Sequence, residues 1–262
     1  MICLKLADTK QLNIKRIICI LLLACAVSLP ADTSFAQEFT TDPMPALEGG
    51  IENEGQLEVN KAEPKLVIIN PGHGGSDLGA RSPKNFLEKN INLRLAKLIK
   101  KKFSFDKEIE IRLTRQSDRS IEFFRRVEIA NTAKSELYIS IHCDGGVGPR
   151  KSAVRLFINK PAAAIKLNDW KSNNNKNDRK NSIIAEKLFV NLKDVVGRNI
   201  EIVPTNLLYL GGLSMPAIVI ESIDLSNPED EIRLRRDDHL INIADAIAKG
   251  IRGYFVATDV GR

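Results

Sequence analysis

The chain has 262 residues, of which 43% are hydrophobic and 27% are charged, proportions that are ordinary for a globular protein. This length can bury one full hydrophobic core and leaves little chain for a second domain. The formal net charge of +6 is scattered, so it does not indicate a nucleic-acid interface, although it suits an anionic polymer or surface.

The first 36 residues have the layout of a secretory signal sequence. Lys15 and Arg16 precede an apolar run at 17–29, and Ser34 and Ala36 supply the small residues at positions −3 and −1 of a cleavage site. The run is shorter than the roughly 20 residues of a membrane-spanning helix. We therefore predict an exported protein of the periplasm or cell envelope, with no transmembrane segment in its mature part.

Two other interpretations of this segment remain open. One is an uncleaved start that associates with the membrane. The other is a lipid anchor, because the sequence LLAC at 22–25 resembles a lipoprotein cleavage site with Cys25 as the lipidated residue.

The remainder divides into a lead-in and one folded domain. Residues 37–64 are acidic and poor in periodic apolar positions, which is typical of a flexible segment. From residue 65 to residue 256, strand-type apolar runs alternate with segments of helical periodicity. In chain order we predict a strand at 65–69, a helix at 88–103, a strand at 108–115, a helix at 119–134, strands at 135–144 and 152–159, a helix at 181–197, a strand at 215–222 and a helix at 239–255. This order predicts a single α/β domain with a twisted, mostly parallel or mixed sheet and helices on both faces.

Ligand-type side chains stand where predicted elements begin or end. His73 follows the first strand, His142 ends LYISIH, Glu221 ends AIVIE, and Glu88 begins the first helix. Ligand sites in such sheets lie beyond the carboxyl ends of the strands. Two imidazoles and a carboxylate with an open position make a catalytic zinc site, and a further carboxylate can take a proton from the bound water.

Structural roles for the same residues remain open at this point. A histidine at a strand end can cap or hydrogen-bond the backbone, Glu88 suits the positive end of a helix dipole, and Glu221 fits an exposed turn. The sequence intervals of 15, 54 and 79 residues match no compact metal motif. His239, in RRDDHLINIA, receives no role.

The order of the sequence motifs along the chain indicates a resemblance to a known family, which the spacing of single residues does not. Five motifs follow one another along the chain, namely PGHGGSDLGA, LEKNINLRLAKLI, IRLTRQSD with RRVEIAN, LYISIH and MPAIVIESIDLSNPED. In these motifs the chain resembles the zinc-dependent N-acetylmuramoyl-L-alanine amidases of the amidase 3 family, over residues 66–254. That family cuts the amide bond between N-acetylmuramic acid and the L-alanine of the peptidoglycan stem peptide.

The resemblance implies roles for particular residues. His73, Glu88 and His142 correspond to the ligands of one Zn²⁺ per chain. Glu221 corresponds to the catalytic glutamate, which accepts a proton from the zinc-activated water and returns it to the leaving nitrogen. By the same resemblance, Asp118, Arg126 and Asn131 match structural positions of the family.

The resemblance also sets the expected partners, with alternatives. The expected partner is peptidoglycan, with an activator protein as a further candidate and no nucleic acid. A non-catalytic cell-wall binding protein on the same fold and a zinc hydrolase of another amide are the alternative functions. The presence of Glu221 argues against the first of these, because a binding protein needs no base.

Three features depart from the family pattern or stand outside it. Asn70 occupies a position where members of the family usually carry Asp. If the Asp carboxylate orients a metal ligand, the Asn70 amide would orient that ligand less strongly. We expect Cys143 to be a small buried hydrophobe, with a soft metal ligand as the alternative. The segment 161–181, which contains Trp170, reads as a surface loop or as a flap beside the substrate.

Overall fold

In the computed structural model of the protein, the residues described are 63–145, 153–159, 177–197, 199–205 and 207–260. The predicted signal sequence at 1–36 with Cys25, the lead-in up to residue 62, and Trp170 with residues 161–176 lie outside these ranges. Among the helices that the structure describes, none combines the length with the hydropathy that a bilayer-spanning segment needs.

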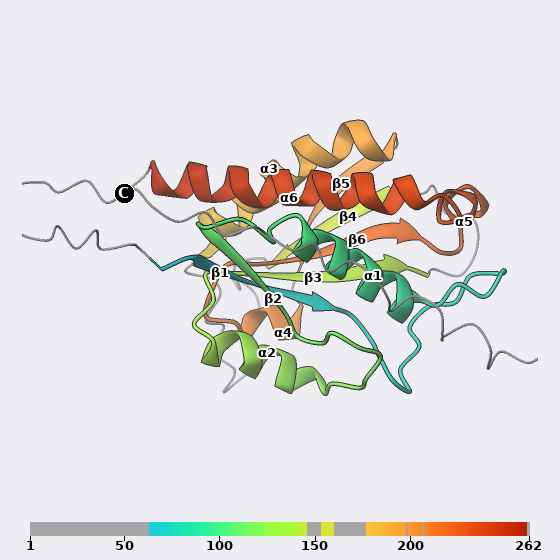
Figure 1. The fold of residues 1–262 in the computed structure, drawn as a ribbon, viewed down its shortest axis with the longest axis horizontal. Helices are drawn as coiled ribbons and strands as arrows, with labels where there is room; N and C mark the ends of the chain where they lie inside the picture. The colour runs from blue at the N-terminus through green and yellow to red at the C-terminus, as the bar shows by residue number, and fades with distance from the viewer. Residues whose placement is uncertain (1–62, 146–152, 160–176, 198, 206, 261–262) are drawn as a thin grey trace, which may run out of the picture. The chain divides into compact units, whose positions relative to one another are not determined.

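A six-stranded sheet forms the centre of the domain (Figure 1), with the order β2-β1-β3-β6-β4-β5. The strands are β1 (Lys65–Pro71), β2 (Ile109–Leu113), β3 (Leu137–Asp144), β4 (Ala153–Asn159), β5 (Asn199–Thr205) and β6 (Ala217–Asp224). β4 runs antiparallel to β6, whereas the pairs β1–β2, β1–β3, β3–β6 and β4–β5 are parallel. The predicted mixed, mostly parallel sheet is therefore confirmed.

Helices cover both faces of this sheet, as predicted (Figure 1). One face packs against α1 (Glu88–Lys101), α3 (Asp178–Val196) and α6 (Asp237–Asp259) in the larger hydrophobic core. The other face packs against α2 (Phe123–Thr132) and α4 (Leu208–Gly211) in a smaller cluster. The short helix α5 (Pro228–Arg233) lies between β6 and α6 in the chain.

Alternation along the central strands decides which side chains reach the site. Leu137, Ile139 and Ile141 of β3 point into the larger core, whereas Tyr138 belongs to the smaller cluster on the α2 side. Because side chains alternate between the two faces of a strand, His142 lies on the same face as Tyr138. The end of β3 therefore presents an imidazole on the α2 side of the sheet.

The strand β5 was not among the predicted elements, and neither were α4 and α5. β5 has the sequence NIEIVPT, most of it exposed or half-exposed, and it forms an edge of the sheet. Proline is tolerated in an edge strand because the N–H that it lacks is not needed for hydrogen bonds between the inner strands of the sheet. The segment gives a weak apolar signal because it is partnered on one side alone, by β4.

Candidate metal centre

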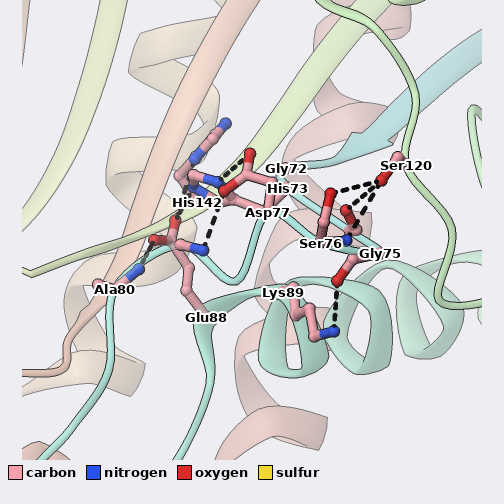
Figure 2. A network of polar contacts seen from close by, with 12 residues as sticks. Gly72, His73, Gly75, Ser76, Asp77, Ala80, Glu88, Lys89, Ser120 and His142 are labelled. Carbon is pink, nitrogen blue, oxygen red and sulfur yellow. Dashed lines mark hydrogen bonds and ion pairs between the residues drawn. The ribbon is translucent and has the colours of Figure 1, made fainter.

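Two imidazoles and one carboxylate meet at the carboxyl ends of β1 and β3. Glu88 Oε1 lies 3.1 Å from His73 Nε2 and 3.0 Å from His142 Nδ1. The ligand atoms of these residues lie within 4.8 Å of one another, and Figure 2 shows the side chains facing a common point. The structure thus brings together the residues that the sequence singled out at the ends of separate elements.

The loop that carries His73 is held in an unusual conformation. His73 has a φ of 59°, a region that non-glycine residues enter at some cost. Arg126 donates hydrogen bonds of 2.9 Å to the carbonyl oxygens of both Pro71 and His73. Arg115, which is fully buried, donates to Pro71 and Gly72. Four hydrogen bonds from two guanidinium groups therefore fix the backbone that aims the His73 ring.

Glycine is required at two positions of the loop that passes close to His142 and Glu88. A Cβ atom at Gly72 would overlap the His142 imidazole. Gly79, which has a φ of 64°, passes so close to the centre that a Cβ there would lie 2.6 Å from Glu88 Oε2. The absence of side chains at these positions lets the loop close tightly around the ligand-type groups.

Glu88 is the most buried member of the group, with 3% of its surface exposed. The Ala80 N–H donates to Oε2 at 2.8 Å, and the Cys143 N–H donates to Oε1 at 3.0 Å. Burial alone would raise the pKa of Glu88, but hydrogen bonds from the two imidazoles and from Ala80 outweigh it and hold the pKa well below its usual range. Glu88 is therefore a fixed anion, as a metal ligand must be.

The donor set fits a zinc ion. Zinc binds imidazole nitrogen and carboxylate oxygen at about 2.0–2.2 Å in a tetrahedron, which places neighbouring ligand atoms about 3.3 Å apart. The two nitrogen–oxygen separations, 3.1 and 3.0 Å, are close to that spacing. Three protein ligands and an open fourth position are also the usual arrangement of a catalytic zinc site.

Asp77 supports the centre from outside the ligand group, and the sequence predictions missed it. Its Oδ2 lies 2.9 Å from His73 Nδ1, so the other ring nitrogen, Nε2, faces Glu88. A carboxylate in this position fixes the ring orientation and tautomer. The sequence shows that Asp77 follows His73 by four residues in PGHGGSDLGA. This separation indicates a contact with the His73 ring only when the conformation of the loop is known.

We expect Asp77→Asn to weaken zinc binding by about 10-fold to about 100-fold, because the second partner of the His73 ring loses its charge. Competition with a chromophoric chelator measures this affinity. Asp106→Asn, on the loop before β2, is the matched control and should leave zinc affinity unchanged. Equal affinities for the Asp77→Asn and wild-type proteins would contradict the assigned role.

Glu221 faces the same space from the next strand. It pairs in register with His142 across β3 and β6, and both side chains line one cavity. The pKa of Glu221 is raised to about 7, first because burial disfavours the charged form and then because the Asp144 carboxylate is near, while Arg155 opposes both effects. The residue is therefore suited to exchanging a proton near neutral pH.

The cavity has a volume of about 640 Å³ and extends from His73 and His142 over the α2 face of the sheet. His73, His142 and Glu221 line one part of it, with Asp77 beside them. The rest has a mainly apolar surface from residues such as Ile121, Phe123, Val127, Tyr138, Phe157 and Val219, and polar side chains including Ser120, Glu122, Arg126 and Ser140 line it as well. A ligand placed here would reach the open side of the His73–Glu88–His142 group.

The remaining residues named from the sequence take structural positions. Asp118 accepts a hydrogen bond from Gly75 N–H and pairs with Lys89. Asn131 bonds the backbone of Gly212 and Ser214. Cys143 is 5% exposed and lies in the larger core, as expected for a small hydrophobe.

Asn70 and His239 lie outside the ligand group. Asn70 bonds Ser140, Thr114 and Arg126, so it reaches the His73 loop through Arg126. His239 lies near the start of α6.

Comparison with known proteins gives a consistent result. The family model Amidase_3, described as N-acetylmuramoyl-L-alanine amidase, matches residues 67–253. The chain is 28% identical over 221 residues to the N-acetylmuramoyl-L-alanine amidase AmiA of Escherichia coli, covering 73% of this chain and 76% of AmiA. It is 27% identical over 201 residues to the probable cell wall amidase LytH of Staphylococcus epidermidis, covering 76% of this chain. The chain spans 61% of the length of that relative.

The solved structures agree with the sequence matches. An N-acetylmuramoyl-L-alanine amidase from Clostridium difficile 630 superposes with a TM-score of 0.65 at 27% identity, over 74% of this chain and 98% of that one. The catalytic domain of CwlV from Bacillus (Paenibacillus) polymyxa gives 0.62 at 24% identity, over 73% and 98% of the two chains, which supports the shared fold.

Proposed function

Because the chain belongs to the Amidase_3 family of N-acetylmuramoyl-L-alanine amidases, we propose that it hydrolyses the amide between N-acetylmuramic acid and the L-alanine of the peptidoglycan stem peptide. The observation that carries this proposal is the convergence of His73, Glu88 and His142 beside Glu221 in one cavity. A binding protein needs no such carboxylate in its site.

We assign the metal to the three converging residues. His73, Glu88 and His142 would hold one Zn²⁺, with Asp77 orienting the first of them. When bound, zinc supplies a Lewis acid that lowers the pKa of water and polarises a carbonyl oxygen.

Glu221 carries the proton in this proposal. It accepts a proton from the water whose oxygen adds to the lactyl carbonyl carbon, and it returns that proton to the alanine nitrogen as the C–N bond breaks. The products are a muramoyl lactyl carboxylic acid and a stem peptide with a free amino terminus. Burial of Glu221 supports this role, because its pKa of about 7 allows both transfers near neutral pH.

The cellular setting follows from the same proposal. We propose residues 1–36 as a cleaved signal sequence and 65–256 as the catalytic domain, with the protein in the periplasm or cell envelope. Lipid anchoring through Cys25 is the alternative, which mass spectrometry of the mature amino terminus distinguishes. An activator protein is a further proposed partner, and co-purification from cell envelopes tests for it.

Digestion of isolated peptidoglycan tests the proposed activity. The zinc-loaded protein should release stem peptides that begin with L-alanine and leave glycan without peptides, as read by mass spectrometry. A metal chelator should abolish the release. Sacculus binding without release would favour the wall-binding alternative, and cleavage of free peptides with intact muramoyl amides would favour a hydrolase of another amide.

A further inference from the structure

The side chain of Arg155 lies among carboxylates, next to the proposed base Glu221. Arg155 of β4 is opposite Glu221 in the antiparallel β4–β6 pair and opposite Glu201 in the parallel β4–β5 pair. Side chains that are directly opposite in a sheet point to the same face. Arg155 therefore lies on the α2 side of the sheet, the side on which Glu221 lines the cavity.

The guanidinium group of Arg155 contacts carboxylates from three other strands. Its Nη1 donates to Asp144 Oδ2 at the end of β3, and the same atom lies 3.6 Å from Glu221 Oε2. Its Nε lies 3.6 Å from Glu201 Oε2. The Nη1 atom thus faces two carboxylates. The Arg155 side chain is 18% exposed, and those of Asp144 and Glu221 are 11% and 25% exposed, so solvent screens these two pairs less than the pair with Glu201, which is 52% exposed.

Without this cation the arrangement would be unfavourable. The side chains of Asp144 and Glu221 are 11% and 25% exposed, and like charges in such surroundings repel strongly. The planar guanidinium fork can hold two carboxylates in fixed directions, which an ammonium group does less well. Removal of Arg155 would leave Glu221 free to turn away from Asp144.

We propose that Arg155 is a positioning residue that holds the Glu221 carboxylate in the part of the cavity lined by His73 and His142. This inference rests on the proposed function, since it assigns Arg155 a role through the proposed base. Arg155 itself would neither bind the metal nor exchange a proton with the substrate. Its effect would be on the geometry of the base, and therefore on kcat.

Variants of Arg155 test this role with two independent measurements. In Arg155→Met, kcat on a soluble muramoyl peptide should fall between about 10-fold and about 100-fold, the effect of a base displaced by about 1 Å. KM and bound zinc should stay at their wild-type values, whereas the melting temperature should fall, because the Asp144 carboxylate loses its cation. Arg155→Lys should recover part of kcat. Crystal structures of the zinc-loaded wild-type and Arg155→Met proteins should show that the Glu221 carboxylate is displaced in the variant.

A double variant separates positioning from a general structural effect. In a Glu221→Gln background, Arg155→Met should cause no further loss, because its action passes through Glu221. Arg112→Met, which removes an exposed pair with Glu110 on the far edge strand, is the matched control and should retain wild-type kcat.

Either of two results would overturn the inference: wild-type kcat in Arg155→Met, or a Glu221 carboxylate that keeps its position there. If the wild-type protein releases no stem peptide, the proposed function fails instead. The crystal comparison then still decides whether Arg155 positions Glu221.

Discussion

Glu221→Gln should lower kcat on peptidoglycan by roughly 1,000-fold, the usual contribution of a positioned general base. Glutamine matches the shape of glutamate but cannot accept the proton of the attacking water. The substitution leaves His73, Glu88 and His142 in place, so bound zinc should not change. Rates from released amino termini, together with metal analysis of the same samples, measure both quantities.

The control for this variant is Glu110→Gln on β2, an exposed carboxylate that pairs with Arg112. It should retain wild-type kcat. A Glu221→Gln protein that keeps more than about one tenth of the wild-type rate would exclude Glu221 as the principal base.

The second large effect is expected at the metal. His73→Asn should remove bound zinc and, with it, detectable amide hydrolysis, because one of the ligands of the centre is lost. Asparagine is the better choice than alanine here, since the φ of 59° at this position is one that asparagine adopts more readily. Inductively coupled plasma mass spectrometry after dialysis gives the zinc content per chain.

His239→Asn is the matched histidine control, because His239 lies in α6 and outside the ligand group. It should retain the zinc content and activity of the wild-type protein. Full zinc occupancy in His73→Asn would show that the metal, if needed, is held elsewhere.

Much of the fold is predictable because its central strands are apolar on both faces. Runs such as KLVII and AIVIE identify β1 and β6 without knowledge of their neighbours. β5 is different, since its place in the sheet depends on pairing with β4 and its own side chains are largely exposed. The helix α2 begins at Phe123 rather than at residue 119, and Ser120 instead bonds the Gly74 carbonyl in the loop of the centre.

The site was predictable to the extent that strand ends carry ligand-type residues. His73, His142 and Glu221 each follow an apolar run, and parallel strands deliver such residues to one edge of the sheet. Asp77 and Arg155 were not predictable in this way. The first depends on the turn of the loop after β1, and the second on an antiparallel register between β4 and β6 that no local pattern encodes.

Hydrolysis of a defined muramoyl dipeptide in ¹⁸O-labelled water tests the central claim most directly. The account predicts that mass spectrometry finds the label in the lactyl carboxylate of the muramic acid product, with an unlabelled dipeptide that begins with L-alanine. Label in a peptide carboxylate, or an uncleaved substrate with zinc bound, would contradict it.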